Sequence, residues 1–178
     1  MLFVGSIFNR RRLPVLITAF AAATATLPGA RLVIAGADRS YPALDLDGLA
    51  AEAGVAGRVE VRHYVTEAEL DALYGRAAVF AFLSEYEGFG LTPLEALSAG
   101  VPIIVLDTPV AREVYGDAAW YVPHDGDVRV AAGAIRTLLE DPSSAAPMLA
   151  AAPGVVARYS WDSAANETLA AIEGIVRR

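Results

Sequence analysis

The stretch 84–96 has the sequence Ser84-Glu85-Tyr86-Glu87-Gly88-Phe89-Gly90-Leu91-Thr92-Pro93-Leu94-Glu95-Ala96. It follows the apolar run 78–83, which predicts a buried strand, and it leads into 94–99, which predicts a helix. The stretch therefore crosses from a strand to a helix through a loop that contains glycines. In an open parallel sheet, such a loop lies at the carboxyl end of a strand, where ligands bind.

Short apolar runs alternate with helical patterns along the rest of the chain. The runs are continuous, which indicates strands that are buried on both faces of a parallel sheet. We therefore predict an α/β fold: one domain over residues 1–178, with a Rossmann-like doubly wound parallel sheet of about six strands and helices on both faces. The other strands are predicted at 2–4, 31–35, 59–61, 102–106 and 119–122.

Helices are predicted where apolar residues recur at helical spacing or where a capping pattern begins. Prolines in the alanine-rich stretch before the last helix are expected to divide it into short helical pieces. Besides 94–99, the helices are predicted at 14–27, 49–53, 128–139 and 161–176, with one more after the capping box 66–69, and the dividing prolines are Pro142, Pro147 and Pro153.

The composition excludes several classes of protein. The 178 residues include no cysteine and no lysine, which excludes disulfides, thiolate metal sites, Schiff-base chemistry and a Walker-type lysine. A formal net charge of −7 argues against nucleic acid as a partner. The cysteine usage fits a cytoplasmic protein, and no apolar run approaches the roughly 20 residues that span a bilayer. Because a core strand begins at residue 2, we expect that Met1 marks a cut in a longer protein.

Two glutamates, Glu87 and Glu95, flank the glycines of the opening stretch. Glycines let the backbone approach a ligand closely, and the free N–H groups at a helix start can donate to it. A sugar ring needs such N–H groups together with carboxylates that accept from its hydroxyls. A purely structural interpretation is also open. Residues 92–95 have the form of a capping box, in which Glu95 would accept from the Thr92 N–H, and Glu87 would be a solvated loop acid.

A cluster of three arginines, Arg10-Arg11-Arg12, follows the first strand. At the carboxyl end of the sheet, guanidinium groups could bind a diphosphate in bidentate fashion, and a solvated loop is the alternative. The isolated histidines His63 and His124 favour structural or solvated roles over catalysis. Loop aspartates could bind a metal, but their spacing matches no metal-binding loop, so we predict no metal site; they are Asp107, Asp117, Asp125 and Asp127.

The segment 87–96, followed by Ala99-Gly100-Val101-Pro102, resembles the signature of glycosyltransferase family 4 (group 1), which has the GT-B architecture. Its glutamates have the family's spacing: a Glu, seven residues, then a Glu. The start 5–11, the segment 65–74 and Ser160-Trp161 are similar to other parts of that family, each more weakly. The resemblance covers nearly the whole chain in the expected order.

The resemblance implies that the chain is the C-terminal, nucleotide-sugar-binding domain of a retaining glycosyltransferase. Such an enzyme transfers a hexose from a UDP-, GDP- or ADP-sugar to an acceptor and requires no metal or other cofactor. By position, the resemblance implies three catalytic residues: Arg10 and Arg11, one of which neutralises the diphosphate leaving group, and Glu87, which faces the transferred sugar. It implies a sugar-donor-binding set made of Gly5, Ser6, Arg62, His63, Phe89, Gly90, Leu91, Thr92 and Glu95.

Within that set, the resemblance gives each part a role. Glu95 accepts from the ribose hydroxyls, and Arg62-His63 lines the nucleobase. The backbone N–H groups of residues 89–91 meet the sugar hydroxyls, and those of 91–92 meet the diphosphate. The chain departs from the family's pattern at two positions: Arg11 stands where a lysine is common, and His63 stands where a small residue is common.

The resemblance also implies a partner, because no segment is left to encode the N-terminal, acceptor-binding domain of a GT-B enzyme. We expect little or no activity from this domain alone, and a location in the cytoplasm or at the membrane periphery through the absent half. The final helix 161–176 is expected to expose an apolar patch and to permit weak self-association. The alternatives are a non-catalytic subunit that pairs with a separate acceptor-binding chain, and another GT-B enzyme such as a nucleotide-sugar epimerase.

Overall fold

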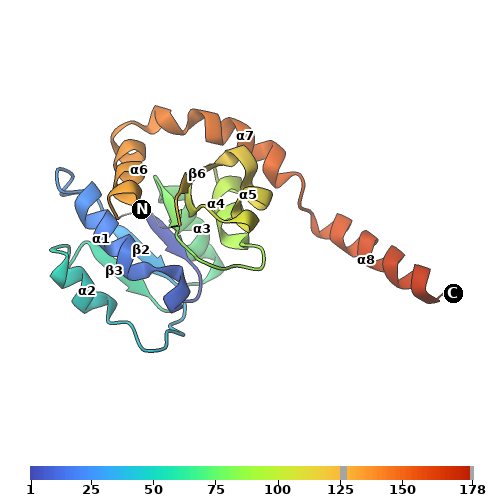
Figure 1. Ribbon diagram of the computed structural model, residues 1–178, viewed down its shortest axis with the longest axis horizontal. Helices are drawn as coiled ribbons and strands as arrows, with labels where there is room; N and C mark the ends of the chain where they lie inside the picture. Colours follow the sequence, from blue (N-terminus) through green and yellow to red (C-terminus); the bar gives the residue numbers. More distant parts are fainter. Residues whose placement is uncertain (125–127, 177–178) are drawn as a thin grey trace.

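The predicted apolar runs form the strands of one parallel sheet in the computed structural model, which describes residues 1–124 and 128–176 (Figure 1). Most of the strand residues are buried, as expected for a sheet that is covered on both faces. The strands are β1 (Leu2–Val4), β2 (Leu32–Ala35), β3 (Val59–Arg62), β4 (Phe80–Phe82), β5 (Ile103–Leu106) and β6 (Ala119–Val122).

The strand order is β3-β2-β1-β4-β5-β6, and every neighbouring pair is parallel. The order reverses between β1 and β4, which pair with Leu2 opposite Phe80. This is the doubly wound arrangement, so the predicted fold class is confirmed. In such sheets, ligands bind outside the carboxyl ends of the strands at the point of reversal. The loops after β1 and β4 therefore flank the expected site.

Helices connect the strands and cover both faces of the sheet (Figure 1). Right-handed crossovers run outward in opposite directions from the reversal point, which places α1 and α2 on one face and α3 and α4 on the other. The helices are α1 (Leu13–Ala23), α2 (Leu46–Glu52), α3 (Glu67–Arg76), α4 (Leu91–Ser98), α5 (Pro109–Tyr115), α6 (Val128–Glu140), α7 (Ala146–Val156) and α8 (Trp161–Val176), with 3₁₀ turns η1 (Asn9–Arg11), η2 (Gly116–Ala118) and η3 (Pro142–Ala145).

Several helix ends differ from the predicted ones, each for a local reason. α1 ends at Ala23 instead of residue 27, because the backbone leaves the helical conformation at Thr24, which has φ −107° and ψ 20°. α2 begins three residues earlier than predicted, because the Asp45 side chain caps it by accepting from Gly48 N at 2.9 Å. The capping box of α3 is confirmed: Glu69 Oε2 accepts from Thr66 N at 2.7 Å.

Two helices, α5 and α7, differ from the predictions in their existence or their extent. α5 has no counterpart among the predicted helices, although Thr108 caps it by accepting from Ala111 N at 3.2 Å and Pro109 lies in its first turn. α7 runs through Pro153, which was expected to break it. The buried residues Met148, Ala152 and Val155 hold α7 against the body of the domain, so tertiary packing outweighs the one hydrogen bond that the proline removes.

α8 extends away from the rest of the molecule (Figure 1). Ser160 caps it as predicted, accepting from Ser163 N at 3.0 Å. None of the residues 161–176 is buried, and Trp161 is 83% exposed. The predicted exposed apolar surface is confirmed, and it includes Leu169, Ile172, Ile175 and Val176. Self-association through it stays a prediction. Within the described residues, no helix is long and apolar enough to cross a membrane.

Candidate functional site

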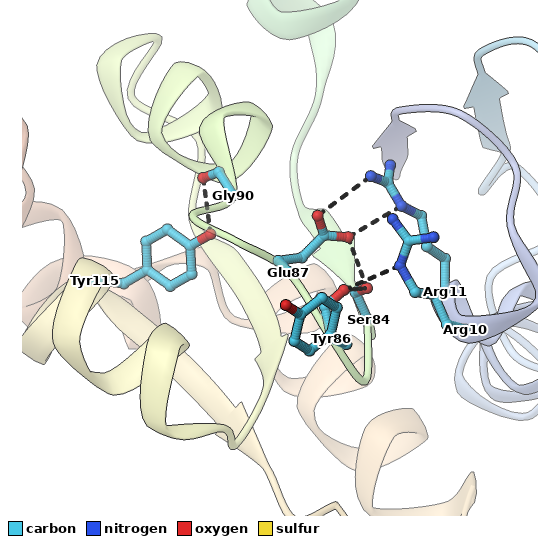
Figure 2. A network of polar contacts seen from close by, with 7 residues as sticks. All are labelled: Arg10, Arg11, Ser84, Tyr86, Glu87, Gly90 and Tyr115. Carbon is cyan, nitrogen blue, oxygen red and sulfur yellow. Dashed lines mark hydrogen bonds and ion pairs between the residues drawn. The ribbon is translucent and has the colours of Figure 1, made fainter.

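Two loops meet at the reversal point of the sheet, one after β1 and the other after β4 (Figure 2). The first loop starts at Gly5, whose φ of 143° favours glycine. A Cβ atom there would overlap the Arg11 guanidinium group. Gly5 therefore leaves the space through which Arg11 crosses toward the second loop. The predicted residues Gly5 and Ser6 both lie at this end of β1 and are half-buried.

The arginine cluster joins the first loop to the second along its whole length. The backbone of Glu85 donates to the Arg10 carbonyl at 2.9 Å, and Arg10 Nε donates to the Tyr86 carbonyl at 3.1 Å. Arg12 Nε lies 3.7 Å from Glu85 Oε1. These contacts connect residues about 75 positions apart in the sequence, so the two loops form one surface. The predicted cluster therefore joins the two loops to each other and also supplies positive charge.

Glu87 lies at the centre of this surface (Figure 2). Arg11 Nε is 3.1 Å from Glu87 Oε1, and Arg11 Nη2 donates to Oε2 at 3.4 Å. The Ser84 hydroxyl donates to Oε1 at 2.7 Å. The side chains of Arg11 and Glu87 are only 11% and 19% exposed, so water and salt weaken the attraction between their charges only slightly. Glu87 is thus an oriented carboxylate and not the solvated loop acid of the structural interpretation.

The guanidinium groups of the cluster differ in their surroundings. Arg11 stacks over the Phe82 ring at 4.8 Å, and burial lowers its pKa while the charge of Glu87 opposes that shift. Arg10 stacks over the Phe8 ring at 4.2 Å. Among the described residues, no carboxylate lies within ion-pair distance of Arg10. Arg10 therefore has a positive charge that a bound anion could balance.

Arg12 adopts a left-handed backbone conformation with φ 52°, which is uncommon for a residue other than glycine. Its Nη1 donates to the His124 carbonyl at 3.0 Å, which ties the loop after β6 to the same edge of the sheet. Strained residues of this kind persist where the surrounding structure fixes them, and they concentrate at functional sites.

The other side of the second loop is held by Tyr115, the last residue of α5 (Figure 2). Its hydroxyl donates to the Gly90 carbonyl at 2.9 Å. Gly90 has φ 93°, and α4 begins at the next residue. Burial, with a smaller contribution from the charge of Glu87, raises the pKa of Tyr115, so its hydroxyl keeps its proton and donates throughout the physiological pH range.

A small pocket of about 20 Å³ lies between the second loop and α5. Its volume suits about one water molecule, so a sugar ring would have to widen it or use its open side. The mixture of apolar walls with a carboxylate and hydroxyls is typical of a ligand site. The lining residues are Phe82, Ser84, Glu87, Phe89, Val105, Leu106, Thr108, Val110, Ala111 and Tyr115.

Glu95 lies on α4 and accepts from the Tyr74 hydroxyl at 2.8 Å. The alternative interpretation of 92–95 as a capping box is wrong, because α4 begins at Leu91 and Thr92 lies within its first turn. The turn at Gly90 starts the helix early, so Glu95 is left as an exposed carboxylate that Tyr74 orients. The first N–H groups of α4, those of Leu91 and Thr92, lack helical partners and face the reversal point.

The predicted nucleobase residues lie farther along the sheet edge. Arg62 ends β3, which β2 separates from β1, and its Nε donates to Glu60 Oε1 at 2.7 Å. His63 is exposed beside it. The structure thus brings together the arginines, the glycine loop and Glu87, places Glu95 on α4 against Tyr74, and places Arg62 and His63 apart from them at the end of β3. Asp125 and Asp127 lie outside the described residues, and the described part of the chain holds no cluster of three or more potential metal ligands.

Three contributors were missed by sequence reasoning: Ser84, Tyr74 and Tyr115. Ser84 stands within the opening stretch, three residues before Glu87, so its position was a usable signal. Tyr74 and Tyr115 reach the stretch across 21 and 25 residues, on helices that precede and follow it. No local pattern indicates such contacts.

The family model for the group 1 glycosyl transferases matches residues 1–154. A GDP-mannose:cellobiosyl-diphosphopolyprenol alpha-mannosyltransferase of Komagataeibacter xylinus is 35% identical over 173 residues, which cover 94% of this chain and 43% of that protein. The D-inositol 3-phosphate glycosyltransferase of Mycobacterium avium is 34% identical over 162 residues, which cover 87% of this chain and 38% of that protein. The chain therefore spans less than half the length of these relatives.

Solved structures share the fold. Sucrose-phosphate synthase from Thermosynechococcus elongatus has a TM-score of 0.83 at 24% identity, over 99% of this chain and 45% of that one. Anabaena HepE in complex with UDP-glucose has a TM-score of 0.81 at 18% identity, over 97% and 48% of the two chains. The family model covers most of the residues, and the sequence relatives agree with it, so this chain belongs to the group 1 glycosyl transferases.

Proposed function

We propose that the chain is the C-terminal, sugar-donor-binding domain of a retaining, family 4 type glycosyltransferase, which transfers a hexose from a nucleoside-diphosphate sugar. The observation that carries this proposal is the Arg11–Glu87 ion pair across the reversal point, with the start of α4 beside it. It brings positive charge and the free N–H groups of a helix start to the same loop as an oriented carboxylate, Glu87, which lines a small pocket. A diphosphate joined to a sugar needs these three kinds of group together.

The geometry supports a distinct role for each charged side chain. Arg10, which has no carboxylate partner among the described residues, binds the diphosphate and stabilises the charge that develops on it as the leaving group. Arg11 shares this field and also fixes Glu87, whose carboxylate accepts from the hydroxyls of the transferred sugar. Glu95, oriented by Tyr74, accepts from the ribose hydroxyls.

The backbone of the second loop supplies the remaining contacts. The N–H groups of Phe89, Gly90 and Leu91 bind sugar hydroxyls, and those of Leu91 and Thr92 bind the diphosphate at the start of α4. Arg62 and His63 line the nucleobase at the outer part of the edge, where β3 ends. The reaction needs no metal in this proposal, because arginine and helix N–H groups balance the phosphate charge.

The acceptor side of the cleft belongs to a part of the enzyme that this chain does not include. The chain spans 43% of the Komagataeibacter relative, whose name specifies GDP-mannose and a diphosphopolyprenol acceptor. An acceptor of that kind would bring the whole protein to the membrane surface. We expect the described domain to bind sugar donors weakly and to turn over little alone, since transfer requires both reactants to be positioned.

Isothermal titration calorimetry with GDP-mannose, UDP-glucose and ADP-glucose at millimolar concentration tests the proposal. Glu95→Ala should weaken nucleoside diphosphate and nucleotide-sugar binding alike, whereas Glu87→Gln should mainly reduce discrimination between sugars. Glu52→Ala, at the exposed end of α2, is the control and should change neither. Binding of none of the donors by the wild-type chain would overturn the proposal. Donor binding without transfer, when an acceptor-binding half is supplied, would instead indicate a non-catalytic subunit.

A further inference from the structure

Tyr115 is a buried side chain with a polar end at the edge of the candidate site. It closes α5, whose start is fixed by the Thr108 cap, and it is only 3% exposed. Its ring lines the small pocket on the side that faces Glu87. A ring held this firmly has one orientation, so its hydroxyl is a fixed point at the pocket wall.

The hydroxyl of Tyr115 contacts the second loop at its most constrained residue. It donates to the Gly90 carbonyl at 2.9 Å, and Gly90 has a left-handed φ of 93°. A Cβ atom on Gly90 would overlap this hydroxyl, so the close approach requires glycine. The bond therefore fixes the direction in which the backbone turns into α4.

The loop 87–90 is held from two opposite sides (Figure 2). Arg11 and Ser84 hold Glu87 on one side, and Tyr115 holds Gly90 on the other. Gly88 and Gly90 bring no side-chain packing of their own, and between them Phe89 packs edge-on against Tyr159, with ring centroids 4.9 Å apart. The Tyr115 bond is the contact that fixes the backbone at Gly90 itself.

We infer that Tyr115 is a positioning residue for sugar recognition, whose hydroxyl holds the Gly90 carbonyl and thereby sets the loop against which the transferred sugar binds. That the ligand is a nucleotide-sugar rests on the proposed function, whereas the hold of Tyr115 on Gly90 is seen in the protein itself. Tyr115 acts on the sugar end of the donor, because the loop 87–90 lines the pocket. The diphosphate and ribose contacts at Arg10, at the first turn of α4 and at Glu95 depend on it much less, because buried residues of α4 and the Tyr74 bond hold that helix in place.

Tyr115→Phe removes the hydroxyl and keeps the ring, so the fold is retained. We expect the dissociation constant for a nucleotide-sugar to rise about five- to tenfold, as for loss of one hydrogen bond, while that for the nucleoside diphosphate stays within about twofold. Tyr121→Phe is a matched control: that hydroxyl also donates to carbonyls of this region, to Gly116 at 2.7 Å and Ala111 at 3.2 Å, but not to the loop. It should change neither constant.

Backbone ¹⁵N order parameters of residues 88–91, measured by NMR without ligand, give a second test. They should fall below about 0.6 in Tyr115→Phe and stay near the rigid value of about 0.85 in the wild-type chain and in Tyr121→Phe. Unchanged order parameters, or equal loss of nucleotide-sugar and nucleoside diphosphate affinity, would overturn the positioning role even where the wild-type chain binds sugar donors. If the order parameters fall in Tyr115→Phe but the wild-type chain binds none of the donors, the proposed function is overturned and only the structural part of this inference remains.

Discussion

α4 is packed against the rest of the domain and α8 is not, so the shorter of the two helices is held more firmly. α4 has eight residues, four of them buried, and Tyr74 and Tyr115 bond to it or to the turn before it. α8 has sixteen residues and an apolar face, and none of its residues is buried. Isolated helices are marginal in water, so tertiary cover and not length determines how firmly a helix is held. α4 can therefore position a site, while α8 has an apolar face still to be covered.

The largest expected effect tests this comparison with one substitution in each helix. Leu97→Ala in α4 should lower the free energy of unfolding by about 3 kcal/mol, because Leu97 is 3% exposed and its loss leaves a cavity. Leu169→Ala in α8 should change it by less than about 0.5 kcal/mol, because Leu169 is 55% exposed. Urea denaturation followed by circular dichroism measures both. An equal loss of unfolding free energy in the two variants would show that another surface covers α8 in solution.

The second expected effect concerns the charge that holds the loop before α4. Arg11→Ala should lower the free energy of unfolding by about 2 kcal/mol, because it leaves the carboxylate of Glu87 partly buried without its cation. Arg62→Ala is the control, since its partner Glu60 is 53% exposed and exposed ion pairs contribute little. Urea denaturation of both variants makes the comparison. An equally small change for Arg11→Ala would mean that Glu87 is solvated after all.

The third expected effect is backbone strain at the start of α4. Gly90→Ala should cost about 2 kcal/mol of unfolding free energy, because φ is positive and the new Cβ atom would overlap the Tyr115 hydroxyl. Gly54→Ala has a similar φ of 72° with open space around it, so it should cost only about 1 kcal/mol. Thermal unfolding of both variants, and of Gly90→Ala combined with Tyr115→Phe, measures the contribution of the overlap. A double variant no more stable than Gly90→Ala would contradict it.

The smallest expected effect appears at alkaline pH. Burial raises the pKa of Tyr74 and of Tyr115 in the folded chain, with Glu95 adding to the shift at Tyr74. A raised folded-state pKa contributes stability that is present below the unfolded pKa of about 10 and is lost as pH rises above it. Near pH 11 the unfolded chain releases the tyrosine proton that the folded chain keeps, so each of the two tyrosines should lower the free energy of unfolding by about 1 kcal/mol. Replacing both by phenylalanine should flatten this decline between pH 9 and about 11, and an unchanged slope would contradict the assignment.

The sheet and its reversal point could be predicted because their signal is local. Each strand is a short apolar run, and the loop with Glu87 and Gly90 follows one of them directly. α5 was missed although Thr108-Pro109 has the form of a helix start, because no clear apolar period follows it over so few residues. The end of α7 was misjudged at Pro153 because packing, which the sequence does not display, outweighs the local preference.

The sequence indicates which residues form the candidate site better than it indicates which of them contact one another. The arginine cluster and the spaced glutamates stand out in the sequence, but that Arg11 meets Glu87, 76 residues away, depends on the sheet order. The alternative capping box at Thr92 fits the residue types equally well, and the early helix start after Gly90, with its positive φ, decides against it. Tyr74 and Tyr115 carry no signal of their role, since any buried tyrosine needs a partner for its hydroxyl.

The position of Trp161 at the start of α8 gives the molecule an internal optical probe. Its indole is 83% exposed, while the other tryptophan, Trp120, is half-buried in β6. Any surface that covers the first turn of α8 would move one indole out of water and leave the other in place. The emission of Trp161 would then shift to shorter wavelength in proportion to the covered fraction. Fluorescence titration can therefore detect any partner that covers this helix.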